Sequence, residues 1–155
     1  MRDRVLAELA DLGPGTADAL ALLGEIRDLA GFIDRAQGEL ARLTGVLDAA
    51  GGAAEAGYSS TAAFLRHGCG RSPGRAGELV AAGRGLRRLE ATGTALTAGQ
   101  ISFDAAHAIC RAAGQLDGAA AAAVEEQLLA FARSQPPPGV ARRSRSPSWR
   151  RSRCR

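Results

Sequence analysis

The sequence predicts an all-α protein, with one long N-terminal helix packed on a bundle of shorter helices that form helix-turn-helix-like units. Two features carry this prediction: an apolar heptad pattern through residues 22–47, and Ser and Pro capping signals before several later helices. No segment has the pattern of a strand. We expect a helical domain at 1–135, with the long helix at about 17–50 and the bundle at about 58–134, followed by a disordered Arg/Ser/Pro tail at 136–155.

The first elements are a short amphipathic helix and the long helix. We expect the short helix at Arg2–Leu12, ended by Gly13-Pro14-Gly15, and Thr16 can cap the long helix. Apolar residues of the long helix then step by four and three over about four heptads, which is a coiled-coil seam. We expect this seam to be buried, within the chain or against a second copy. Its residues are Leu22, Ile26, Leu29, Ile33, Ala36, Leu40, Leu43 and Leu47.

Glycine also recurs every seven residues, at Gly24, Gly31, Gly38 and Gly45, on the face opposite the seam. Each costs about 1 kcal/mol against Ala in a helix interior. Two explanations stay open. The stripe admits a second helix at close range, or GC-rich coding scatters glycine and the period is chance.

Capping residues set the boundaries of the bundle helices. Gly51-Gly52 loosens or ends the long helix, and Ser59 or Ser60 caps a short helix through about His67. Ser72, with Pro73 at the first helical position, starts the next helix. Ser102 caps a further helix, and Asp117 caps the last one, from about Gly118 to Arg133, before three prolines end it.

An offset of 30 residues relates the helix capped by Ser72 to the helix capped by Ser102. The offset pairs are Ser72 with Ser102, Ala76 with Ala106, Leu79 with Ile109 and Leu86 with Leu116. Either this is a weak internal repeat of a helix-turn-helix unit, or both segments converged on the same capping and core requirements. We expect the apolar members to point inward, together with Val80, Gly83, Cys110 and Ala113.

Charge divides the chain in two. Residues 1–135 hold 13 arginines against 16 acids, a formal charge of −3, whereas residues 136–155 hold seven arginines and no acid. A nucleic-acid-binding body needs a basic face, which this acidic composition does not supply. We expect the tail to be an unstructured product of a shifted reading frame; the rival interpretation is a basic arm for nucleic acid.

The amino-acid composition also indicates the kind of source genome and the cellular location, and it excludes some types of catalytic site. The chain contains no Lys and no Asn, which indicates a high-GC bacterial genome and excludes a Gly-Lys-Ser/Thr phosphate loop and a lysine Schiff base. We find no signal peptide and no run that could span a bilayer, so we expect no membrane association. Three cysteines without a CxxC pair indicate reduced thiols in the cytoplasm.

Candidate chemistry is sparse. His67, Cys69, His107 and Cys110 could supply four zinc ligands, but their spacing matches no common zinc module and capping already explains these segments. The glycines around Cys69 resemble a phosphate-cradling loop, yet no strand precedes them, so a helix-linking turn is the simpler account. We expect no catalytic residue, no metal and no cofactor.

Five arginines form the basic cluster of the body, and they are the candidate DNA contacts. In a helix-turn-helix the N-terminal residues of the second helix meet base edges. Alternatively, these side chains are the solvated polar face of a helical bundle. The five are Arg71, Arg75, Arg84, Arg87 and Arg88.

A sequence pattern across residues 57–133 resembles the actinobacterial family called domain of unknown function 222. It combines a Gly-Tyr-x-Ser start, two Ser-capped helices with Ala four residues on, and an Ala-Gly-x-Ile-Ser turn. The matching positions are Gly57, Tyr58, Ser60, Ser72, Ala76, Ala98, Gly99, Ile101, Ser102 and Ala106. A long helix before the Gly-Tyr pair also fits this family.

The resemblance implies a helical domain that precedes an HNH nuclease domain, in which His residues activate water and hold a divalent metal at a DNA phosphate. Residues 136–155 contain no His, Asn, Asp or Glu, so no nuclease residue can be carried over. We therefore expect a truncated or frameshifted N-terminal part that is not an enzyme. Its expected role is to position DNA or partner subunits. The alternatives are a helix-turn-helix DNA-binding protein and a structural homodimer joined along the long-helix seam.

Overall fold

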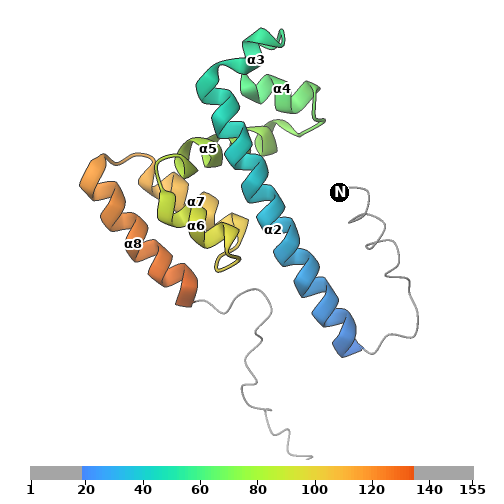
Figure 1. The fold of residues 1–155 in the computed structure, drawn as a ribbon, viewed down its shortest axis with the longest axis vertical. Coiled ribbons are helices and arrows are strands. Elements are labelled where there is room, and N and C mark those ends of the chain that lie inside the picture. Colours follow the sequence, from blue (N-terminus) through green and yellow to red (C-terminus); the bar gives the residue numbers. More distant parts are fainter. Residues whose placement is uncertain (1–18, 135–155) are drawn as a thin grey trace, which may run out of the picture.

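The computed structural model describes residues 19–134, which form seven α-helices and no strand (Figure 1). The predicted all-α class and the long N-terminal helix are confirmed. The expected helix at Arg2–Leu12, the Thr16 cap and the expected disorder of the tail lie outside the described residues. In chain order the helices are α2 (Ala19–Ala50), α3 (Gly52–Glu55), α4 (Thr61–His67), α5 (Pro73–Leu86), α6 (Glu90–Thr97), α7 (Phe103–Ala113) and α8 (Gly118–Ser134).

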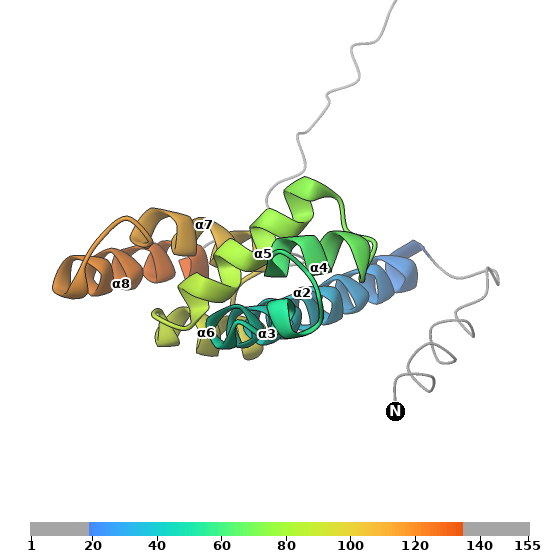
Figure 2. The same cartoon turned by 90° about the horizontal axis from the view of Figure 1, so that it is seen from above.

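The long helix α2 organises the arrangement. Its 32 residues span about 48 Å at 1.5 Å per residue. Its C-terminal half crosses α5, with which it makes its most extensive contact, and α7 packs between α5 and α8. The blue N-terminal part of α2 projects beyond the other helices in both views (Figures 1 and 2).

Serine caps begin three of the helices, as predicted. Ser60, Ser72 and Ser102 each accept a hydrogen bond from the backbone N–H three residues on, at 3.1, 3.3 and 3.2 Å. These bonds satisfy donors that a helix start leaves without partners. The four offset pairs also have equivalent surroundings: two caps, two pairs of buried core residues, and Leu86 and Leu116 half-buried.

Two elements were not predicted. Gly51 adopts a left-handed φ of 67°, and one helical turn, α3, follows it. The helix α6 begins after Leu89, which supplies no side-chain cap, so the sequence carries no local start signal there. Its cap comes instead from α8. The carboxylate of Glu125 accepts bonds from the Thr92 N–H at 2.8 Å and the Thr92 hydroxyl at 2.7 Å.

A second cap of this kind starts α7. Asp34 of α2 accepts a hydrogen bond from the Phe103 N–H at 2.9 Å, beside the local cap of Ser102. A carboxylate at a helix N-terminus is also favoured by the helix dipole. Among the described residues, no buried side-chain N or O atom lacks a hydrogen-bond partner. The polar contacts between helices therefore fix α2 against α7 and α8 against α6.

The core is built from small and medium-sized side chains. The residues expected to point inward from the two Ser-capped helices are buried, apart from Leu86 and Leu116, which are half-buried. Phe103, Leu65, Leu79 and Leu96 are the large apolar side chains that lie almost wholly inside. Ala supplies much of the remaining interior, so the helices approach one another closely.

Part of the glycine stripe provides this close approach. A Cβ atom on Gly45 would lie 2.6 Å from the carbonyl carbon of Gly83, and one on Gly38 would lie 2.6 Å from a methyl carbon of Leu96. Gly24 has no neighbour within 4 Å, and Gly31 meets only Arg35 of its own helix. The close-approach interpretation is therefore confirmed for Gly38 and Gly45.

Most of the seam, in contrast, is not buried by residues 19–134, although Leu40 packs against the core. Ile26 is 63% exposed, Leu43 50% and Ile33 44%, whereas the opposite face of α2 holds the buried Gly38, Ala41 and Gly45. Burial of the whole seam by the described part of the chain, one of the two expected arrangements, is wrong. The physical reason is that the bundle packs on the small residues of α2, where backbones come closest. Burial against a second copy stays a prediction.

Replacing Gly45 with Ala should destabilise the fold by about 1–3 kcal/mol, since the new methyl group meets the backbone of α5 and cannot be accommodated by a side-chain rotation. Gly31→Ala is the matched control in the same helix. It should be neutral or stabilise by up to about 1 kcal/mol, because it gains helix propensity without a clash. Urea unfolding measures both, and equal effects would contradict the close crossing.

Candidate interaction surfaces

The exposed apolar residues of α2 follow the heptad pattern. With Ile26 and Ile33 at position a, all seven large exposed apolar side chains of α2 fall at positions a, d, e or g, and none at b, c or f. These are the four positions that contact a partner in a two-stranded coiled coil. The seven are Leu22, Leu23, Ile26, Phe32, Ile33, Leu43 and Val46. We call this surface the α2 seam.

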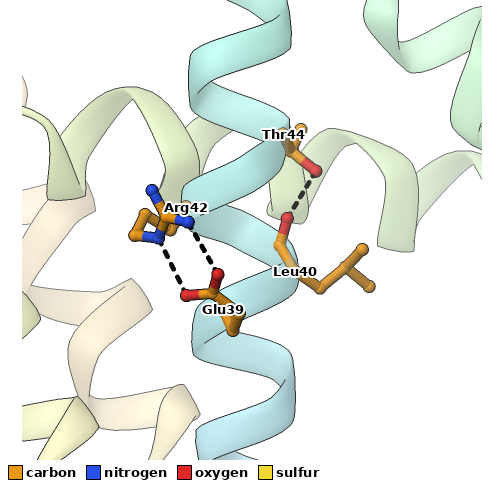
Figure 3. A network of polar contacts seen from close by, with 4 residues as sticks. All are labelled: Glu39, Leu40, Arg42 and Thr44. Atoms are coloured by element: carbon orange, nitrogen blue, oxygen red, sulfur yellow. Dashed lines mark hydrogen bonds and ion pairs between the residues drawn. The ribbon is translucent and has the colours of Figure 1, made fainter. Parts of the chain in front are cut away.

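Two sets of side-chain hydrogen bonds form within α2. Arg42 donates to Glu39 at 2.8 and 2.7 Å, and the Thr44 hydroxyl donates to the Leu40 carbonyl at 2.8 Å. Figure 3 shows the Leu40 side chain pointing away from the Glu39–Arg42 pair. The pair thus lies on a different side of the helix from the Leu40 side chain.

The two arginines at the start of α5 differ in their surroundings. Arg71 is exposed in the turn before the helix, and its backbone N–H donates to the Leu65 carbonyl at 2.9 Å. Arg75 is half-buried: it pairs with Glu78 at 2.8 Å, and its guanidinium lies 4.8 Å from the centre of the Phe103 ring. Arg75 therefore contributes to the packing between α5 and α7.

The three arginines at the end of α5 are also mostly engaged. Arg84 makes two bonds to Asp48 of α2, at 2.6 and 3.2 Å. Arg88 donates to the carbonyls of Gly114 at 3.4 Å and Leu116 at 2.8 Å, beyond the end of α7. Arg87 is exposed. The structure thus places the five arginines at both ends of α5 rather than on one continuous face.

A groove of about 800 Å³ lies between α5 and α7, near the end of α5. It is lined by small residues such as Ala81, Gly85 and Ala112, and by Arg84, Arg88 and Arg111. No carboxylate is among its lining residues. Sequence reasoning did not include Arg111 in the basic cluster. The sequence signal that could have identified this groove was the small residues spaced by four on α5 and on α7.

The His and Cys candidates are not brought together. Cys69 is exposed, whereas Cys110 is buried and its thiol donates to the Ala82 carbonyl at 3.9 Å. Burial, and to a lesser degree the charge of Glu125, raises the pKa of the Cys110 thiol to about 12. His107 stacks on the Phe103 ring. Within residues 19–134, no three His, Cys, Asp or Glu side chains form a group suited to a metal ion.

Comparison with known proteins assigns the family. The family described as Domain of unknown function (DUF222) matches residues 23–142, and the chain belongs to it. No curated protein and no solved structure matches the chain. No helix of the described region has the length and apolar character needed to cross a bilayer.

The residues that carry the family resemblance have structural roles in this chain. Three are the helix caps described above, and Ala76, Ala106 and Ile101 lie in the core. Gly57 and Gly99 hold positive φ angles of 79° and 70°, which favour glycine. The shared pattern therefore encodes the turns and packing of the bundle.

Asp48→Asn should lower stability at pH 7 by about 0.5–1 kcal/mol, a modest value because Arg84 is 67% exposed. The hydrogen bonds from Arg84 hold the pKa of Asp48 below its usual value. The carboxylate thus stabilises the fold above the unfolded-state pKa of about 3.9 and loses this effect as pH falls through the lower folded-state pKa. Wild type and variant should converge below about pH 4.

Urea unfolding from pH 7 to pH 2.5 measures this convergence. Glu39→Gln is the control, because both partners of the Glu39–Arg42 pair are more than half exposed. A stability difference between wild type and Asp48→Asn that stays constant over this range would show that the lost charge is not its origin.

Proposed function

We propose that this chain is a non-catalytic helical domain that positions partner subunits, and that it does so by pairing with a second copy along the α2 seam. The observation that carries this proposal is the exposure of seven apolar side chains at the four coiled-coil contact positions. Within the family, the positioned activity would be the HNH nuclease that the sequence resemblance implies.

The size of the α2 seam supports pairing of two copies. Its seven side chains are 41–63% exposed, so together they present on the order of 600 Å² of apolar surface per copy. Two copies would bury roughly 1,200 Å², which reaches the lower end of specific protein interfaces. Isolated exposed apolar residues need no explanation, but apolar surface of about 600 Å² along one helix is at the upper end of what monomers expose, and such patches are often functional.

A role without catalysis is supported by the state of the reactive side chains. The Cys110 thiol is buried and stays protonated at neutral pH, and the ring of His107 is stacked on Phe103. Ser60, Ser72 and Ser102 accept bonds as helix caps.

We further propose a cytoplasmic setting in a high-GC actinobacterium, supported by the free thiols Cys69 and Cys110 and by the lysine-free composition.

Ile26→Asp should abolish pairing, because each copy would bring an unpaired carboxylate into the contact. Phe131→Asp on α8 is the matched control, since Phe131 is also 63% exposed but lies off the seam. Sedimentation velocity should give a dimer for wild type and the control, and a monomer for Ile26→Asp. A wild-type chain that remains monomeric at high concentration would refute the proposal.

DNA contact is the second candidate role. The groove between α5 and α7 favours it, since Arg84, Arg88 and Arg111 line one depression, where Arg84 is also paired with Asp48 and Arg88 with backbone carbonyls. Guanidinium groups bind phosphate oxygens, and such contacts position a protein on a duplex without reading its sequence. The acidic balance of residues 1–135 opposes this role, so we rank it below pairing.

Arg111→Ala should weaken binding to random duplex DNA and reduce the slope of log K against log salt by about one, the value for one lost phosphate contact. Arg66→Ala, on the exposed end of α4, is the control and should change neither. Both variants keep the arginines of residues 136–155, so non-specific binding by that segment contributes equally to all measurements. Identical slopes for wild type and Arg111→Ala would leave the groove without a role in DNA binding.

A further inference from the structure

We infer that the two copies pair in parallel, as a two-stranded coiled coil running from Leu22 through Leu43 of α2. This inference rests on the pairing proposed above and adds its direction. It places the two helical bundles at the same end of the dimer, with the projecting N-terminal parts of α2 side by side at the other end.

The identity of the a and d residues favours this direction. In the projecting part of α2, β-branched Ile26 and Ile33 occupy position a, and Leu22 and Leu29 occupy position d. Ile at a with Leu at d is the combination that favours parallel two-stranded coiled coils. No a or d position from 22 to 47 is polar or charged.

The flanking positions are compatible with the same direction. In a parallel pair, a g residue of one helix faces the following e residue of the other. Glu25 would then face Ala30 of the second copy, whereas Thr44, the e residue that follows Glu39, is buried in its own chain. No like charges would meet across the contact.

The projecting part of α2 also needs a partner to be stable as a helix. From Leu22 to Gln37 no residue is buried, and the first buried residue of the helix is Gly38. The Asp34 carboxylate accepts a bond from Phe103, but the turns before it have little packing, which leaves a helix marginal in water, and Gly24 and Gly31 weaken it further. A second copy laid along the seam would supply the apolar contact that residues 19–134 do not provide.

The bundle leaves room for the second helix. Ala41 and Gly45, which face α5, are buried, whereas Leu43 lies between them in sequence and is 50% exposed. The seam and the bundle meet at one edge of these turns, where Thr44 at position e is buried and Leu40 at position a is half-buried against the core. Contact through the exposed Leu43 and Val46, at positions d and g, therefore requires no rearrangement of the packing between α2 and α5.

Disulfide formation between copies tests the direction. In a background with Cys69→Ser and Cys154→Ser, which leaves the buried Cys110, Ile26→Cys should oxidise to a linked dimer. In a parallel pair the two residues 26 face each other within disulfide range, a Cα separation of about 4.4–6.8 Å. In an antiparallel pair residue 26 faces residue 43, and the two residues 26 lie about 25 Å apart along the helices. Gly24→Cys, on the face opposite the seam, is the control and should not link.

The oxidised products and the mass of the reduced protein decide the outcome. A reduced species of twice 15.9 kDa that links through Ile26→Cys, and equally through Leu22→Cys, supports the inference. A reduced dimer that links only when Ile26→Cys and Leu43→Cys chains are mixed would overturn the parallel direction and leave pairing intact. A monomer would overturn both. Reaction of the Ile26→Cys variant with a thiol reagent would then tell whether the seam is open or is covered by another segment of the same chain.

Discussion

The contact between Gly45 of α2 and Gly83 of α5 is the constraint on which the rest of the bundle depends. A Cβ on either glycine would meet backbone of the other helix, so the two helices cross where neither residue has room for a side chain. This crossing determines which face of α2 turns inward, and with it the positions of Asp34 and Asp48, which bond α7 and α5. It also lets a core with few large side chains reach close packing.

An unusual division of the long helix follows from this crossing. Amphipathic helices ordinarily bury their apolar stripe, but α2 buries Gly38, Ala41 and Gly45 and exposes Ile26, Ile33 and Leu43. Its internal packing depends on backbone proximity, and much of its apolar stripe is left exposed. The proposed pairing of two chains would thus use a face of the helix other than the one that stabilises each chain.

Local signals made much of this fold predictable from sequence. Ser60, Ser72 and Ser102 cap helices where capping rules place them, and the inward faces of α5 and α7 follow the apolar period. The helix α6 escaped prediction because Glu125, 33 residues away from Thr92, supplies its cap. The exposure of the seam and the inclusion of Arg111 in the groove were also not predicted from the sequence. Periodicity identifies which residues share a face, but whether that face turns inward depends on contacts between distant helices.

Caps supplied from distant helices also bear on how the chain folds. The bonds from Glu125 to Thr92 and from Asp34 to Phe103 join residues 33 and 69 positions apart. The first turn of α6 has no local side-chain cap and depends on the docking of α8, whereas α2 adds a second cap to α7 beside that of Ser102. Secondary structure is thus linked to the formation of long-range contacts. Fragments that separate α6 from α8, or α2 from α7, would lose helix content as well as packing. The bundle should therefore unfold as one cooperative unit, with no helix pair persisting as a populated intermediate.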